Sequence, residues 1–114
     1  MDSILTSIKK LLGPSGEYEA FDPDIIMHIN TVFMDLRRIG VGPVRGFRIE
    51  DDTTTWTDFI PDADLLRLEA IKDYVYLNVK LLFDPPTNGS HMESINKRIE
   101  KLEWTINMAA ESEV

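Results

Sequence analysis

The chain has 114 residues, of which 43% are hydrophobic, and its formal net charge is −8. This length suits one domain with one core, and the absence of cysteine excludes a disulfide scaffold, thiol catalysis and cysteine-ligated zinc. The acidic balance argues against attraction of the whole molecule to nucleic acid and against an anionic membrane surface as a partner. We expect no sequence-specific nucleic acid partner and no membrane. Because no basic segment follows Met1, we expect no secretory signal and an intracellular product. We predict a single, mainly α-helical domain over residues 1–114.

Two helices are predicted in the first third of the chain. Residues 3–12 place apolar side chains at helical spacing before Gly13-Pro14 ends the pattern. Residues 22–39 form the second pattern, with Asp22 as the expected N-cap and Gly40 after its end. Both predicted helices have one apolar face, so each is expected to pack against the core.

The outward face of the second predicted helix is unusually apolar. Met27 and Met34 lie seven residues apart on this face, where charged side chains are usual. Methionine on an outward face suits an adaptable contact surface, although two methionines can also simply meet an adjacent loop. We keep both interpretations and treat Met27 and Met34 as candidate partner contacts.

Residues 45–57 change in character and predict a β-hairpin between the second and third helices. Apolar and charged residues alternate in its first half, at Phe47, Arg48, Ile49 and Glu50. A turn at Asp51-Asp52 and a β-branched stretch over residues 53–57 follow. The expected architecture is therefore a small four-helix domain with one inserted hairpin.

The third predicted helix, over residues 62–83, is the longest and most apolar pattern in the chain. Its apolar residues form two stripes on opposite sides, one through Ile71 and Val75 and the other through Tyr74 and Leu77. A helix that is apolar on two sides needs partners on both, so we expect this helix at the centre of the domain.

The last predicted helix spans residues 91–109. Its apolar seam is Met92, Ile95, Ile99, Leu102, Ile106 and Ala109. Trp104 and Met108 lie one turn apart on the outer side among charged residues, which is typical of an anchor for a protein partner. The alternative is that the hairpin or the N-terminal helix folds over Trp104.

Charge is segregated along the middle of the chain. A basic block of four arginines comes first, at Arg37, Arg38, Arg45 and Arg48. An acidic block follows it directly, at Glu50, Asp51 and Asp52. Blocks of opposite sign suit head-to-tail contact between copies of the chain, which closes into a ring if the rotation allows. Alternatively, the two blocks neutralise each other within the hairpin region.

No pattern in the sequence predicts catalysis or a cofactor. The acidic residues between 50 and 64 do not match a calcium loop, and a solvated turn with helix-capping aspartates explains them better than a metal site. A metal-dependent hydrolase using Asp51, Asp52 and Asp62 is the weaker alternative. His28 and His91 lack a serine or carboxylate at a recognisable spacing, so we predict that the chain is not an enzyme.

Two segments carry a resemblance to a known class of proteins. They are Lys72-Asp73-Tyr74-Val75-Tyr76-Leu77-Asn78-Val79-Lys80-Leu81-Leu82-Phe83-Asp84-Pro85-Pro86 and Leu102-Glu103-Trp104-Thr105-Ile106-Asn107-Met108-Ala109-Ala110-Glu111. With the runs at residues 24–30 and 50–56, they resemble the head-to-tail connector, or adaptor, proteins of tailed phages. The similarity is one of overall pattern, and it covers most of the chain.

This resemblance implies a structural virion protein at the head-tail junction, present in the host cytoplasm during assembly. Such subunits form a ring, commonly of twelve copies, that joins the portal protein to a head-closure or tail-completion protein and leaves a channel for DNA. In that family the C-terminal segment often docks onto the portal. The alternative from another class is a small cytosolic, phage-encoded regulatory module that binds one partner through Trp104 and Met108.

Overall fold

The computed structural model describes residues 3–61 and 65–112, without the side chains of residue 15 and residues 109–112. Its helices are α1 (Ile4–Leu12), α2 (Asp22–Arg38), α3 (Trp56–Phe59), α4 (Leu65–Phe83) and α5 (Gly89–Ser112). Short 3-10 turns at Gly13–Gly16 and Glu19–Phe21 connect α1 to α2. The predicted helical class is confirmed, and the four long helices follow the expected pattern. The predicted start of the third helix, at residue 62, lies outside the described residues.

Side-chain capping bonds mark the starts of the first and last helices. The Ser3 hydroxyl accepts a hydrogen bond from the backbone N–H of Thr6 at 3.1 Å, which satisfies one of the free donors at the start of α1. Asn88 does the same for α5, because its Oδ1 accepts from the N–H of Ser90 at 2.8 Å. Both helices therefore start where a short polar side chain can replace a missing backbone acceptor.

The predicted N-cap of α2 is wrong. Asp22 is the first helical residue, and the cap position belongs to Phe21, which makes no side-chain capping bond. The preceding 3-10 turn already holds Phe21 in a helical conformation, so the chain runs into α2 without the extended residue that a side-chain cap requires. The Asp22 carboxylate instead forms an ion pair with Lys9 of α1, at 2.8 Å.

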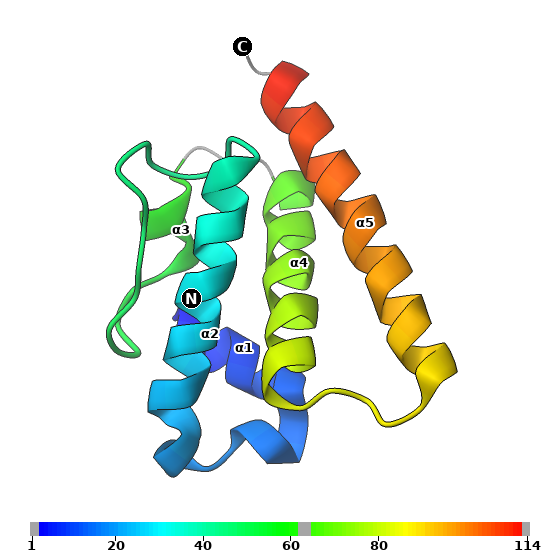
Figure 1. Cartoon of the computed structure of the whole chain (residues 1–114). Coiled ribbons are helices and arrows are strands. Elements are labelled where there is room, and N and C mark those ends of the chain that lie inside the picture. Colours follow the sequence, from blue (N-terminus) through cyan, green and yellow to red (C-terminus); the bar gives the residue numbers. More distant parts are fainter. Residues whose placement is uncertain (1–2, 62–64, 113–114) are drawn as a thin grey trace.

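α4 occupies the centre of the molecule, between α2 and α5, with α1 packed against α2 and α4 (Figure 1). Both of its predicted stripes are covered in the middle of the helix: Ile71 and Val75 are fully buried on one side, and Tyr74 and Leu77 are buried on the other. Burial of this kind contributes about 1.5–3 kcal/mol for each large apolar side chain. α4 therefore contributes buried side chains to the core from both of its sides, as its two apolar stripes predict.

The predicted β-hairpin is wrong, because the described residues contain no β-strand. The only pairing in and around the predicted hairpin, among the residues described, is an isolated antiparallel bridge between Ser3 and Thr55. Phe47 and Ile49 do face inward while Arg48 and Glu50 are exposed, so the alternation was interpreted correctly. What is missing is a partner strand, since the second half of the predicted hairpin folds differently.

The second half of that segment forms the cap and the single turn of α3. Asp58 Oδ2 accepts from the backbone N–H of Thr55 at 2.8 Å, so these residues make a capping pair that starts a helix. Trp56 then turns inward, is 1% exposed, and donates from Nε1 to the hydroxyl of Ser7 at 2.8 Å. A local cap and a buried tryptophan thus outweigh the β-branched composition of residues 53–57.

Candidate interaction surfaces

A loop over residues 41–55 runs along the outer side of α2 and is fixed to it by side chains (Figure 1). Asn30 takes the place of a partner strand: its Oδ1 accepts from Ile49 N at 2.8 Å, and its Nδ2 donates to Ile49 O at 3.0 Å. Near the start of the loop, Arg37 Nε donates to the backbone oxygen of Val44 at 2.8 Å. The loop is therefore pinned at two points about two helical turns apart on α2.

Aromatic rings hold the middle of this loop. The ring of Phe47 lies 5.4 Å from that of Phe33 on α2 and 4.9 Å from that of Phe59 on α3, measured between centroids. Gly42 is required at the beginning of the loop, because its φ is +91° and an added Cβ would lie 2.6 Å from the Phe59 ring. These contacts give the loop a defined position beside α2.

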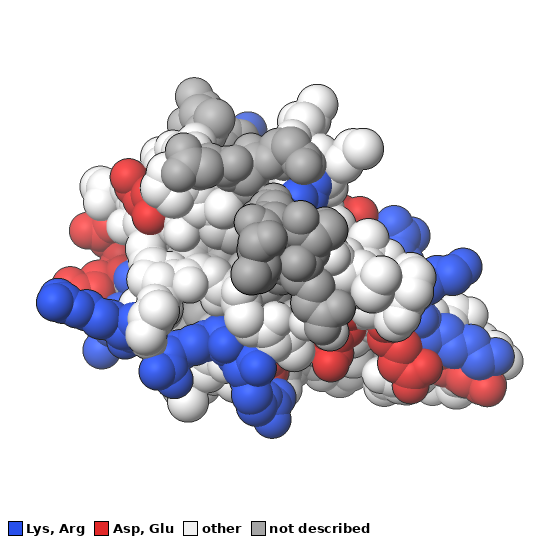
Figure 2. Space-filling view, turned by 90° about the horizontal axis from the view of Figure 1, so that it is seen from above, with Lys and Arg blue, Asp and Glu red and all other residues white. Residues whose placement is uncertain are grey.

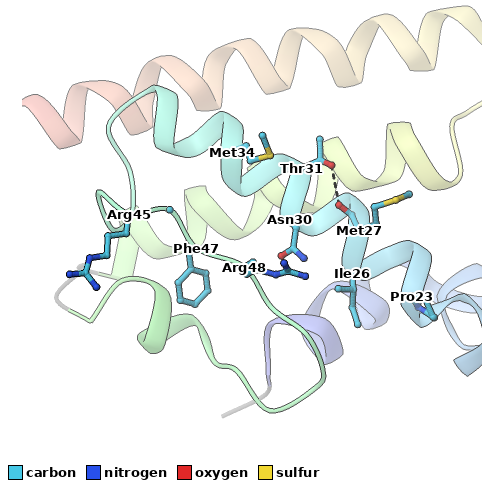
Figure 3. Close-up of a pocket in the computed structure, with 10 residues that line it drawn as sticks. Pro23, Ile26, Met27, Asn30, Thr31, Met34, Arg45, Phe47 and Arg48 are labelled. Carbon is cyan, nitrogen blue, oxygen red and sulfur yellow. Dashed lines mark hydrogen bonds between the residues drawn. The ribbon is translucent and has the colours of Figure 1, made fainter.

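Between α2 and this loop lies an open groove of about 650 Å³ (Figure 3). We call it the α2 groove, and its lining residues are Pro23, Ile26, Met27, Asn30, Thr31, Met34, Arg45, Gly46, Phe47 and Arg48. Met27 is 56% exposed and Met34 is 72% exposed, so neither methionine is covered by the loop. The groove joins four predicted site residues that come from two different blocks of the sequence, namely Met27, Met34, Arg45 and Arg48.

The second surface is the outer face of α5, which we call the α5 face and define by Glu100, Lys101, Trp104 and Met108. Trp104 is 66% exposed and Met108 is 47% exposed, whereas Ile95 and Ile106 on the opposite side of the helix are buried. The seam prediction is thereby confirmed for Ile95 and Ile106; the side chain of Ala109 lies outside the description. Neither the loop nor α1 covers Trp104. Its role as a partner contact stays a prediction.

The basic and acidic blocks lie at the end of α2 and along the loop that follows it. Seen from above, Lys and Arg side chains gather along one edge of the molecule, while both signs alternate on the side of α5 (Figure 2). Arg38 pairs with Asp35 at 2.7 Å, and Arg37 bonds to the loop backbone. Within the described part of the chain, Arg45 and Arg48 form no ion pair and are exposed.

The acidic block does not neutralise these arginines. Asp51 accepts hydrogen bonds from the hydroxyl and the backbone N–H of Thr53, which lowers the pKa of Asp51. Glu50 and Asp52 are exposed, and no ion pair within the described ranges involves them. The block therefore forms a solvated turn stabilised by Thr53, and whether it meets a neighbouring subunit stays a prediction.

Among the titratable groups that the structure describes, Tyr74 has a large pKa shift, and its position is structural. Burial between α4 and α5, and then the nearby Glu103 carboxylate, raise the pKa of Tyr74 to about 12. The Tyr74 hydroxyl donates to Glu103 Oε2 at 3.4 Å, so it joins the two helices. No metal-binding group of three or more His, Cys, Asp or Glu residues occurs in the described part of the chain. No described helix is long and apolar enough to cross a membrane.

Sequence reasoning missed the parts of the site that depend on tertiary contacts. It placed Met27 and Met34 outward and Arg45 and Arg48 in a basic block, but did not bring the two pairs together. Asn30 was the available signal, because an amide on the outward face between two methionines can bond a backbone that passes alongside. The structure describes no contact that joins Trp104 or Met108 to the α2 groove within one molecule.

Comparison with known proteins identifies a family. The family model described as "Phage connector protein" matches residues 4–113, which is nearly the whole chain. No curated protein and no solved structure matches significantly. The family match spans all the described helices, including α2, the loop beside it and α5.

Proposed function

The chain belongs to the phage connector protein family, and on this premise we propose that it is a ring-forming subunit at the head-tail junction of a virion. The ring joins the portal protein to the next neck or tail component, a head-closure or tail-completion protein, and leaves an axial channel for DNA. The family is structural rather than enzymatic, so the work of this subunit is to make contacts. The observation that carries the proposal is the family match over residues 4–113.

The surfaces of the molecule support a subunit that contacts several neighbours. Trp104 and Met108 expose large apolar area on α5, and Met27 and Met34 expose more on α2. Exposed aromatic and methionine side chains are enriched where proteins contact one another. The α2 groove and the α5 face are made by different helices, so one molecule can contact a neighbour through each. A subunit of a ring between two other rings needs several such surfaces.

Charge supports the same role. The molecule is acidic overall, with a net charge of −8, and exposes its acidic block on the loop beside α2. A wall of this sign repels the phosphate backbone, which lets DNA pass without being held. We further propose that Arg37, Arg38, Arg45 and Arg48 meet carboxylates of the adjacent subunit. Opposite charges across a contact set its register more than its strength.

The test is native mass measurement of the protein alone and mixed with the portal protein of the same virus. We expect a large complex with the portal that contains many copies of this chain. Reversing the charge of Arg45 and Arg48 should impair its assembly while the helical far-UV circular dichroism of the subunit is unchanged, and added salt should weaken it. A matched control is reversal of Lys10, which is exposed on α1 and lies outside both surfaces.

Other results would point to other functions. A stable one-to-one complex with a single partner and no ring would favour a small regulatory module of the host cytoplasm. Thermal stabilisation by Mg²⁺ or Ca²⁺ would favour the metal-dependent alternative. Assembly that is indifferent to both the charge reversal and the salt concentration would remove the basic block from the subunit contact.

A further inference from the structure

We propose that the α5 face of one copy of this chain occupies the α2 groove of the next copy, with Trp104 as its anchor. The inference rests on the proposed ring function and specifies which surfaces join adjacent subunits. Each molecule carries both halves of the contact, on different helices. A contact between two different surfaces leaves one of each free, so it repeats from copy to copy and closes when the rotation permits.

Apolar complementarity is the first argument. The α2 groove presents Met27, Met34 and Phe47 from two sides, and methionine adapts its shape to an aromatic ring and makes favourable sulfur contacts with it. Trp104 supplies a large ring, exposed on 66% of its surface, and Met108 extends the apolar surface by one turn. A buried aromatic side chain removes about 150–250 Å² from water. The groove, with its volume of about 650 Å³, has room for such an anchor.

Charge complementarity is the second argument, and it also sets the direction of docking. On α5, Glu100 lies to one side of Trp104 and Lys101 to the other, by their helical positions. Neither forms an ion pair within the part of the chain that the structure describes. On the groove, Arg45 and Arg48 stand on the loop rim, and both are exposed.

The sign of the charges at this rim favours an antiparallel arrangement of the two helices. In that arrangement the Glu100 edge of α5 meets the rim that carries Arg45 and Arg48. A parallel arrangement would bring the Lys101 edge to the same rim. Antiparallel docking places Met108 toward the beginning of α2, near Met27.

The arrangement of the fold supports this contact. α5 lies at one side of the molecule and the loop that borders the groove at the other (Figure 1). The side chains that line the groove come from α2 and the loop, with Met34, Arg45 and Phe47 at one end and Met27 and Pro23 at the other (Figure 3). An incoming helix can therefore lie along α2, with its aromatic anchor between the two methionines.

The chain contains no cysteine, so the contact is testable by site-specific crosslinking. Two single variants, Met27→Cys and Met108→Cys, are mixed and treated with a short bismaleimide, as free protein and in the presence of the portal. We expect a crosslinked heterodimer at a yield about tenfold above that of a control mixture, because docking raises the effective concentration of the two thiols. The control mixture pairs Met108→Cys with Tyr18→Cys, an exposed position outside both surfaces.

A charge exchange tests the direction. Arg45→Glu in the Met27→Cys chain should lower the heterodimer yield about tenfold, and Glu100→Arg in the Met108→Cys chain should restore it. A yield equal to that of the control, both with and without the portal, overturns the proposal. Homodimers formed by Met27→Cys alone at the same yield would also overturn it, because they indicate a twofold contact.

The outcome is separable from that of the proposed function. If many copies assemble with the portal but the Met27 and Met108 positions do not crosslink, the ring exists and is built through other surfaces. If the positions crosslink but no large complex forms with the portal, the contact between copies stands and the connector role fails.

Discussion

Replacing each tryptophan by alanine separates folding from assembly within one pair of variants. Trp56 is 1% exposed, packs in the core and donates a hydrogen bond to Ser7, whereas Trp104 is 66% exposed on α5. The side chains are identical, so the difference between the two variants measures location alone. We expect Trp56→Ala to act on stability and Trp104→Ala to act on association.

The expected magnitudes follow from burial. Deleting a buried tryptophan costs about 3–5 kcal/mol, and a protein of this size has only about 5–15 kcal/mol of stability in total. Trp56→Ala should therefore lower the melting temperature by about 10 °C or more. Trp56→Phe keeps most of the buried ring and loses the bond to Ser7, so it should cost about 1–2 kcal/mol. Trp104→Ala should stay within about 0.5 kcal/mol of the parent, as expected for an exposed position.

The assay is chemical unfolding followed by circular dichroism, with association measured separately by sedimentation. Trp104→Ala should weaken assembly by about tenfold or more, which corresponds to about 1.4 kcal/mol of binding free energy. Trp56→Phe leaves Trp104 as the only tryptophan, and its fluorescence should be quenched readily by acrylamide in the free protein. Strong destabilisation by Trp104→Ala would refute the reasoning, since it would mean that Trp104 belongs to the core.

Three further predictions concern contacts within the molecule. Val75→Asp should lower the free energy of unfolding by several kcal/mol, because it buries an unpaired charge. Leu66→Asp, at an exposed position of the same helix, should have little effect. Similar stability of the two variants would disprove the central position of α4. Asn30→Asp keeps the oxygen that accepts from Ile49 N but loses the amide that donates to Ile49 O, so it should lower the free energy of unfolding by about 1–2 kcal/mol. An unchanged stability in the same assay would mean that these hydrogen bonds do not hold the loop. Tyr74 should ionise in the folded protein at a pKa of about 12, above its ordinary value of 10.0. Because the phenol loses its proton at lower pH in the unfolded chain, the free energy of unfolding should fall as the pH rises from about 10 toward 12. Phenolate absorbance, with Tyr74→Phe as the reference, should show the ionisation of Tyr74 moving to lower pH in Glu103→Gln. An unmoved titration would contradict the contribution assigned to the Glu103 carboxylate.

The sequence determined the long helices because their signals are local. The two apolar stripes through Val75 and Tyr74 placed α4 between two layers, and the seam through Ile95 and Ile106 predicted the buried side of α5. Periodicity records which side of a helix avoids water, and that information lies within a few turns of chain. The outward positions of Trp104 and Met27 followed from the same reasoning.

Only the tertiary structure decided what the middle of the chain does. The alternation at Phe47 and Ile49 correctly placed these side chains inward, but it did not reveal what their backbone would pair with. Asn30, nineteen residues away from Ile49, supplies that pairing, and the cap made by Asp58 starts a helix where a second strand was expected. A strand requires a partner outside its own run of residues. The alternation of side chains does not show whether residues 53–57, Asn30 or another segment will be that partner. For the same reason, the groove that joins the methionines of α2 to the arginines of the loop exists only once Asn30 and the aromatic rings have fixed that loop beside the helix.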